Sequence, residues 1–376
     1  MKKIYSYLCD KFGFNRFSPV YDLGFDGRAD QKRVMISYLS DGLLQGLNSF
    51  SFTTNRHENS IIIKEFITQG YVVDIYDCRD TTSDFDSKKY DFIFGFGYPF
   101  RSGKLTEGGV RILYCTESHP ELLFSRESKR VEEFNARHNA SLKNERSGAY
   151  YKSEDYFLAN DFYVMGEANS DYLINTIRID SNKISLINPT GIEPTYTKAE
   201  LKSKANDFLW FGSRGFILKG LDIVIEAFLQ TNFENKLHIC GVDEKVIRKF
   251  YPKLNERFVF HGQVDVKEDR FKTILEQCSY IVLASASEGV STSILTGMRH
   301  GLIPIVSKEC GLRNGKLGVE FEECSISEIK NVMTHYARKS NVEIERLSKE
   351  IYSFANKEFC LTSYEKQINE LISRLK

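Results

Sequence analysis

Several features that would assign a protein to a class at once are missing from this 376-residue sequence. Fifty-one basic residues balance 51 acidic ones, so no excess of charge indicates nucleic acid or an anionic membrane as a partner. No run of about 18 uncharged apolar residues indicates a membrane span. The first 15 residues lack the apolar core and the cleavage site of a secretory leader. We therefore expect a globular, cytoplasmic chain without nucleic-acid binding and with at most peripheral membrane contact.

Metal and disulfide patterns are missing as well. The eight cysteines form no C-x-x-C pair, and some, such as Cys115 and Cys240, lie in apolar runs, which is typical of reduced core thiols in the cytosol. The histidines show neither H-E-x-x-H nor H-x-H spacing. We expect no metal and no cofactor.

What the sequence does contain is an alternation of apolar, strand-length segments with helical patterns. Strands are expected at 32–40, 71–77, 91–97, 110–117 and 183–194, with a helix at 58–70 and a strand, turn and helix within 161–177. After residues 195–205 the pattern restarts, with strands at 207–213, 236–241, 257–264, 279–285 and 302–307 and helices at 219–230 and 269–279. Near-continuous apolar strands favour parallel sheets covered on both faces. The pattern predicts an α/β fold with two doubly wound, Rossmann-like domains whose ligand site lies in the cleft between them.

The stretch GSRGFILKG, residues 212–220, joins an expected strand to an expected helix. Arg214 and Lys219 flank this turn at the carboxyl end of the strand, where two cations and a helix N-terminus can surround a phosphate or diphosphate. The segment is not a P-loop, because it lacks G-K-[ST]. A surface loop with two solvated cations is the alternative interpretation.

A second strand-to-helix turn lies in residues 285–307. Glu288 and Gly289 end the strand, and a helix begins near Ser291 and Thr292. Backbone N–H groups there would face the same mouth of the cleft and, with the two cations above, form a site for a dianionic leaving group. Glu288 would accept hydrogen bonds from a neutral polyol, since a second anion would repel phosphate. A capping carboxylate is the alternative.

These residues carry a resemblance to retaining GT-B glycosyltransferases of the glycosyl transferases group 1 family. The motifs occur in the family's order: Arg214-x4-Lys219-Gly220, HGQV at 261–264, SEG at 287–289 and G-x-x-P-I-V at 301–306. Looser similarities extend the resemblance over about residues 32–376. It implies an acceptor domain over 1–198, a nucleotide-sugar domain over 199–357 and a C-terminal helix over 358–376 that crosses back to the first domain.

The resemblance implies transfer of a sugar from a nucleotide-diphosphate donor to a saccharide or lipid-linked acceptor, with retention of configuration and no metal. By the same analogy the product belongs to polysaccharide biosynthesis. Arg214 and Lys219 would hold the diphosphate, Glu288 would bind sugar hydroxyls, and His119 would contact donor sugar or acceptor. For His119, a loop histidine with structural partners is the alternative. Further donor contacts are expected from Gly212, Ser213, Gly262, Val264, Gly289, Ser291, Thr292 and Thr296.

The sequence departs from the family pattern at two places. Thr296 stands where the family has the second acid of E-x7-E, which holds the ribose diol; losing one charge-assisted bond costs roughly 1.5–3 kcal/mol. We expect altered nucleotide recognition with catalysis kept. The family's paired glycines before the first helix are replaced by Arg56 and His57, which leaves the contacts of that loop open.

Other interpretations remain. Asp84 and Asp86 form the D-x-D of a metal-dependent GT-A enzyme, but they lie in a polar run typical of a solvated loop. Thr296 suggests a catalytically silent GT-B scaffold, whereas Arg214, Lys219 and Glu288 argue against one. The same fold also serves epimerases and phosphorylases. The charged residues 125–155 are either a solvated helix and loop or a mobile element on the acceptor side. Donor, base, acceptor and oligomeric state stay open.

Overall fold

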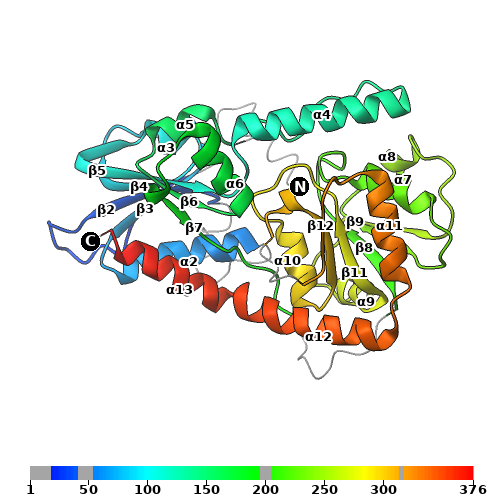
Figure 1. Cartoon of the computed structure of the whole chain (residues 1–376). Coiled ribbons are helices and arrows are strands. Elements are labelled where there is room, and N and C mark those ends of the chain that lie inside the picture. Colours follow the sequence, from blue (N-terminus) through cyan, green and yellow to red (C-terminus); the bar gives the residue numbers. More distant parts are fainter. Residues whose placement is uncertain (1–17, 41–53, 149, 195–204, 313–316, 376) are drawn as a thin grey trace.

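The computed structural model describes residues 18–40, 54–148, 150–194, 205–312 and 317–375. In these residues the chain forms two α/β domains that lie side by side (Figure 1). One sheet is built from residues before position 195 and the other from residues after position 204, each with helices along its faces. We call residues 187–194, which follow the last strand of the first sheet, the linker. The predicted fold class, two doubly wound domains facing each other, is confirmed. The predicted domain boundary at residue 198 lies outside the described residues.

The first domain contains a seven-stranded sheet in the order β1-β3-β2-β4-β5-β6-β7. Its strands are β1 (Val20–Leu23), β2 (Arg33–Tyr38), β3 (Val72–Asp77), β4 (Lys89–Gly95), β5 (Lys104–Cys115), β6 (Asp161–Val164) and β7 (Ile184–Leu186). All pair in parallel except β1, an antiparallel edge strand beside β3 that the sequence analysis missed. The helices are α2 (Thr54–Thr68), α3 (Tyr98–Ser102), α4 (Pro120–His138), α5 (Ser153–Leu158) and α6 (Glu167–Tyr172), the last continued by a π-helix at Leu173–Ile177.

The second domain contains a six-stranded parallel sheet in the order β10-β9-β8-β11-β12-β13. Its strands are β8 (Asp207–Phe211), β9 (Leu237–Cys240), β10 (Phe258–Gly262), β11 (Cys278–Leu283), β12 (Ile303–Ser307) and β13 (Val319–Phe321). The helices are α7 (Leu221–Leu229), α8 (Glu244–Arg248), α9 (Asp269–Gln277), α10 (Thr292–Arg299), α11 (Ile326–Ala337) and α12 (Asn341–Glu358). The last helix of the chain, α13 (Leu361–Ser373), packs on the first domain. β13, α8, α11 and α12 were not predicted.

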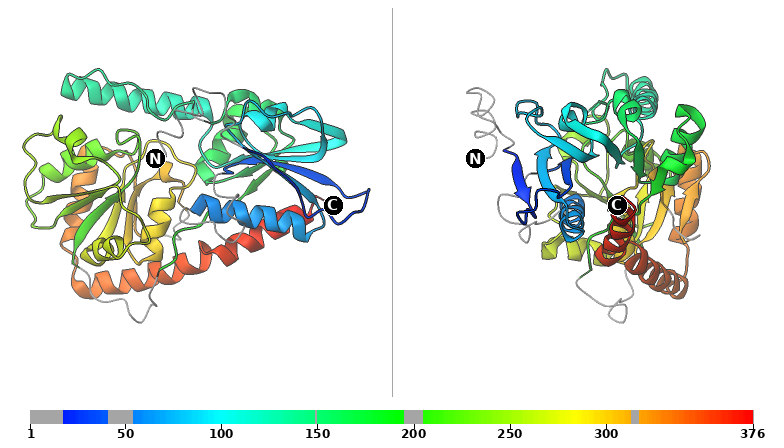
Figure 2. Two further views of the ribbon diagram at one scale, coloured as in Figure 1. Left: turned by 180° about the vertical axis from the view of Figure 1, so that it is seen from behind. Right: turned by 90° about the vertical axis from the view of Figure 1, so that its left-hand side faces the viewer.

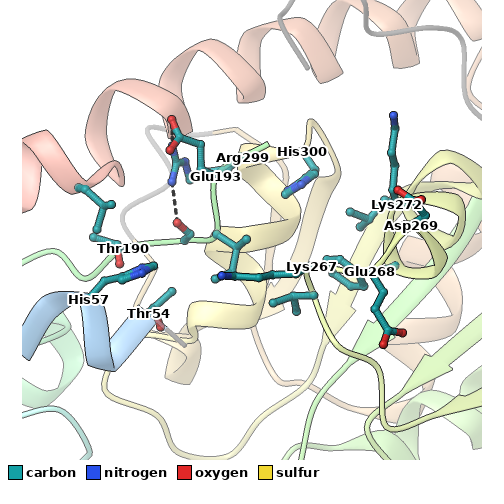
Figure 3. A pocket seen from close by; sticks show the side chains of 16 residues that line it. Thr54, His57, Thr190, Glu193, Lys267, Glu268, Asp269, Lys272, Arg299 and His300 are labelled. Atoms are coloured by element: carbon teal, nitrogen blue, oxygen red, sulfur yellow. Dashed lines mark hydrogen bonds and ion pairs between the residues drawn. The ribbon is translucent and has the colours of Figure 1, made fainter. Parts of the chain in front are cut away.

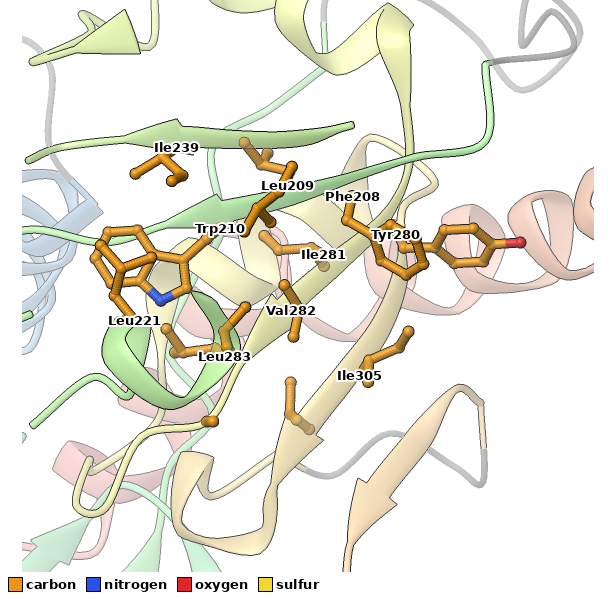
Figure 4. Close-up of a cluster of buried hydrophobic side chains, with 14 of the residues drawn as sticks. Phe208, Leu209, Trp210, Leu221, Ile239, Tyr280, Ile281, Val282, Leu283 and Ile305 are labelled. Atoms are coloured by element: carbon orange, nitrogen blue, oxygen red, sulfur yellow. The ribbon is translucent and has the colours of Figure 1, made fainter. Parts of the chain in front are cut away.

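The core of the second domain explains why its strands read as continuous apolar runs. Every residue of β9, β11 and β12 is buried, because helices cover both faces of the sheet. Phe208 stacks on Tyr280 with ring centroids 4.8 Å apart, and Trp210 fills the space toward α7 (Figure 4). This packing fixes the carboxyl ends of β8 and β11, from which the two predicted turns leave the sheet.

Helices connect the two domains on opposite sides of the molecule: α12 and α13 on one side, and α4 on the other (Figures 1 and 2). On one side α12 packs in the core of the second domain, and α13 then packs on the first. The hydroxyl groups of Tyr364 on α13 and Tyr114 on β5 lie 2.8 Å apart, and Asn369 donates to Glu65 on α2. The C-terminal helices α12 and α13 therefore pack against both domains.

On the other side, α4 starts in the first domain and ends on the second. Val131 and Phe134 are buried in the second domain's core, and Arg137 forms an ion pair with Asp222 on α7. The interpretation of residues 125–155 as a solvated helix and loop is therefore wrong for one face of α4. The prediction followed the overall charge of the segment and overlooked a narrow apolar face of the helix, which is sufficient to pack one side of a helix against a core.

The structure also shows where the D-x-D aspartates and the cysteines lie. Asp84 and Asp86 are exposed on the loop between β3 and β4, in agreement with a solvated loop. Five of the seven cysteines in the described ranges are buried. Among the described helices, none has the length and apolar character needed to cross a membrane.

Candidate active site

A cavity of about 420 Å³ lies between the two domains, and both contribute to its wall. We call it the interdomain cavity. The first domain lines it with Thr54, Asn55, Glu58, Thr116, Glu117, Arg146 and Met165. The linker and second domain line it with Ile192, Phe211, Gly212, Ser213, Lys219, Gln263, Val266, Glu288, Val290, Ser291, Thr292, Ser293 and Thr296.

Lys219 and Glu288 meet in this cavity. Lys219 precedes α7, and Glu288 follows β11, so the carboxyl ends of two adjacent parallel strands bring them together. The Nζ of Lys219 lies 2.6 Å from Oε1 of Glu288, and the hydroxyl of Ser285 donates to the same oxygen across 3.0 Å. Both side chains are largely but not wholly buried, with exposures of 10% and 14%. The site thus holds a cation and a hydrogen-bond acceptor side by side.

The two domains touch at this point. The hydroxyl of Ser118 donates to the carbonyl oxygen of Glu288 across 2.8 Å, and that of Ser287 donates to Ser118. Gly289 makes the approach possible, since a Cβ there would lie 2.3 Å from the carbonyl oxygen of Thr116. Any other residue at 289 would push the two strand ends apart.

The helix N-terminus predicted beside this pair is present. α10 begins after its N-cap Ser291, and Ser291, Thr292 and Ser293 all line the cavity. No side chain caps this end within the described residues. Its first backbone N–H groups and the positive end of the helix dipole therefore face the region where an anion would bind.

Thr296 lines the cavity, but its hydroxyl is already engaged. It donates to the carbonyl oxygen of Thr292 across 2.8 Å and accepts from the backbone N–H of Ile192 across 3.1 Å. Ile192 belongs to the segment that leads from the first domain toward the second. In this structure the position expected to contact ribose fastens the linker to α10.

A buried carboxylate of the first domain accepts hydrogen bonds from the same segment. Glu58, on α2, is 1% exposed and accepts from both the N–H and the hydroxyl of Thr190. Its Oε2 has no hydrogen-bond partner among the described residues. Burial raises the pKa of Glu58 from its ordinary value to about 7.

Arg146 and Glu117 add a second pair of charges that the sequence analysis missed. Their side chains lie 2.7 Å apart, and both face the cavity beside Lys219 and Glu288. Burial raises the pKa of Glu117 against the opposing effect of Arg146. Glu117 lies two residues after the end of β5, so the rule that pointed to Glu288 would also have found it. Arg146 lies in a charged, irregular segment that carries no such signal.

Several predicted site residues do not line the interdomain cavity. Arg214 is exposed on its loop. His119 is 1% exposed and is the N-cap of α4, where its Nδ1 accepts from the N–H of Glu121. Burial lowers the pKa of His119. The structure therefore places His119 as in the alternative interpretation, a histidine with structural partners. Gly262, Val264 and Gly289 also lie outside the lining, whereas their neighbours Gln263, Val266 and Glu288 belong to it.

A second space of about 370 Å³, the adjoining cavity, shares Thr54, Ile192 and Val266 with the first. It lies between α2, the linker, α9 and the end of α10 (Figure 3). Arg299 crosses its wall and donates to the carbonyl oxygen of Gly191 across 2.6 Å. Both apolar and charged side chains line it, among them Phe271 and Lys272. The described residues contain no group of three His, Cys, Asp or Glu side chains that could hold a metal ion.

Comparisons with known proteins agree with this architecture. Residues 205–337 match the model of the family described as Glycosyl transferases group 1. A search of curated proteins found no relative.

Among solved structures, the chain is similar to WaaG, a glycosyltransferase involved in lipopolysaccharide biosynthesis, with 12% identity, a TM-score of 0.59, and 91% of this chain and 99% of that chain covered. It is also similar to HepE (Alr3699) of Anabaena in complex with UDP and glucose, with 13% identity, a TM-score of 0.55, and coverage of 92% and 100%. A third is sucrose-phosphate synthase of Thermosynechococcus elongatus, with 12% identity, a TM-score of 0.58, and coverage of 92% and 99%.

At these identities the solved structures establish the fold, and the family model covers the second domain. The resemblance inferred from the sequence is confirmed: the chain has the GT-B fold, and its second domain resembles the glycosyl transferases group 1 family.

Proposed function

We propose that the protein is a glycosyltransferase that moves a sugar from a nucleotide-diphosphate donor to a saccharide or lipid-linked acceptor, without a metal and with retention of anomeric configuration. The observation that carries the proposal is the Lys219–Glu288 pair beside the N-terminus of α10, in a cavity that both domains line. The family match over residues 205–337 and the printed ligands of HepE, UDP and glucose, support it.

In this proposal the reaction breaks the bond between the anomeric carbon and the diphosphate oxygen, and it forms a bond to an acceptor hydroxyl. Lys219 and the N–H groups at the start of α10 offset the negative charge that develops on the departing diphosphate. Glu288 accepts hydrogen bonds from donor sugar hydroxyls. The departing phosphate oxygen takes the proton of the acceptor hydroxyl.

The donor is proposed to lie along the interdomain cavity. Its sugar is placed near Glu288 and its nucleoside toward Gln263 and Val266, where the adjoining cavity begins. Arg214 is exposed on the loop after Gly212 and is proposed to reach the diphosphate only from the cavity mouth. His119 stays a prediction, because its imidazole is occupied as a helix cap.

The test is a panel of nucleotide sugars examined first for thermal stabilisation and then for turnover. A true donor should raise the melting temperature, since it binds the native state alone. Turnover should persist in EDTA, and NMR of the product should show the donor's anomeric configuration. Inversion of configuration, or loss of turnover in EDTA, would contradict those parts of the proposal.

A catalytically silent GT-B scaffold is the second candidate, and the engagement of Thr296 with the linker favours it. It predicts donor binding without transfer or hydrolysis, or no donor binding at all. Hydrolysis of any bound nucleotide sugar, abolished by Glu288→Gln, would exclude it.

A further inference from the structure

Arg146 lies on a loop whose backbone is bound by a buried carboxylate. The carboxylate of Glu127, which is 1% exposed, accepts the backbone N–H groups of residues 145, 146 and 147 at 2.8–2.9 Å. The hydroxyl of Ser147 donates to the same carboxylate. A buried carboxylate that accepts this many bonds fixes the loop backbone, so Arg146 projects from a defined point.

The same loop is attached to the loop of the second domain that follows β8. The carboxylate of Glu145 accepts the backbone N–H of Gly215 across 3.0 Å. Gly215 has a φ of +88°, and a Cβ there would lie 2.9 Å from Cγ of Arg146. The stem of Arg146 therefore lies directly on the loop that was predicted to hold the diphosphate.

The side chain of Arg146 then enters the site, where Arg214 does not. Arg146 lines the interdomain cavity together with Lys219 and Glu288, and its guanidinium bonds Glu117. Arg214, on the loop that follows β8, is exposed and is not among the residues that line the cavity. Of the two arginines, the one from the first domain is placed to meet a ligand bound at Lys219.

We propose that Arg146 is the second cation of the diphosphate site and that Glu117 keeps it in position until the diphosphate arrives. This inference rests on the proposed function. Arg146, Lys219, Glu117 and Glu288 form a cluster with no net charge. A diphosphate would replace Glu117 on the guanidinium, whose planar fork matches two phosphate oxygens. One cation from each domain would then hold the leaving group.

Titration calorimetry of the full chain with UDP, GDP and ADP, and with the corresponding nucleosides, tests the inference. Arg146→Ala should raise the Kd of the diphosphate that binds best by about tenfold to a hundredfold, because a charge-assisted bond is lost. The Kd of the matching nucleoside should change little. Arg146→Lys should restore part of the affinity, and Arg214→Ala should have a smaller effect than Arg146→Ala.

Two further variants separate ligand binding from a structural role. Glu117→Gln removes the same ion pair but frees Arg146, so it should leave diphosphate binding unchanged or make it tighter. Equal weakening by Glu117→Gln and Arg146→Ala would overturn the inference, because Arg146 would then act only through the pair. Arg346→Ala, on an exposed ion pair of α12, is the control and should bind as the wild type does.

The outcomes also separate the proposed role of Arg146 from the proposed glycosyltransferase function. If the wild type binds none of the three diphosphates, the proposed function fails and the inference falls with it. If the wild type binds a diphosphate and Arg146→Ala binds it equally well, the inference alone is overturned. A larger loss of diphosphate affinity in Arg214→Ala than in Arg146→Ala would also overturn the inference, because Arg214 would then be the second cation of the diphosphate site.

Discussion

The ammonium group of Lys219 donates to the carboxylate of Glu288 across 2.6 Å, although 69 positions separate the two residues in the chain. Each lies in the loop that follows the carboxyl end of a parallel strand, and the pairing of β8 with β11 brings these two loops together. The pair is the point from which the proposed chemistry can be tested.

Replacement of Lys219 should impair turnover more than folding. Lys219→Ala removes the positive charge opposite the leaving group, and turnover of the donor identified in the panel should fall on the order of 100-fold. Lys245→Ala, at an exposed position on α8, is the matched control. Steady-state kinetics with thermal unfolding of each variant separates the two effects, and unchanged turnover in a folded Lys219→Ala protein would contradict the assignment.

Thr296→Val should weaken the attachment of the linker to α10. The N–H of Ile192 would lose its acceptor, and the loss of a hydrogen bond at such a partly buried position costs about 0.5–1.5 kcal/mol of unfolding free energy. Thr296→Ser retains the hydroxyl and should lose less. Urea unfolding of the three proteins measures the difference, and equal stability of the valine and serine variants would show that the bond contributes nothing.

Glu58 should make folding stability depend on pH. Its pKa is raised to about 7 by burial, so the native state keeps a proton that the unfolded chain releases near pH 4.5. The contribution of this group is greatest below that value and is lost as pH rises through 7, by on the order of 3 kcal/mol. Glu58→Gln removes the dependence. Urea unfolding at pH 5 and pH 8 should show the wild type losing more stability than the variant, and parallel losses would exclude the effect.

Phe134→Ala should detach α4 from the second domain. Phe134 is fully buried and makes edge contacts with Phe216 and Phe250. Deleting a buried aromatic ring costs about 3–5 kcal/mol. Phe124→Ala, on the same helix but 59% exposed, should cost far less. Chemical denaturation of both variants is the measurement, and similar losses would mean that the contact is unimportant.

The second domain was predictable because its signals are local. β11 is a mostly apolar strand that is followed within a few residues by a carboxylate and a turn, and strand–helix alternation predicts that this carboxylate lies at the cleft. The same reasoning located Lys219. These inferences needed only sequence periodicity and the known binding edge of parallel sheets.

What the sequence could not predict depends on contacts between distant segments. Arg146 reaches the cavity because Glu127 binds the backbone of its loop, and neither residue has a recognisable motif. The hydroxyl of Thr296 is engaged by the linker through a backbone N–H 104 positions away. His119 follows a strand end as a site residue would, yet it is turned into a helix cap.

The attachment of α4 has a consequence for dissecting the protein into parts. A fragment cut at the linker would separate the second sheet from Val131 and Phe134, which complete its core, and from α4's Arg137, the ion-pair partner of Asp222. The first sheet would in turn lose α13, whose Tyr364 is fully buried against it. Each half of the chain thus contributes part of the other's interior, and neither sheet is a module that can be exchanged or expressed by a single cut between them.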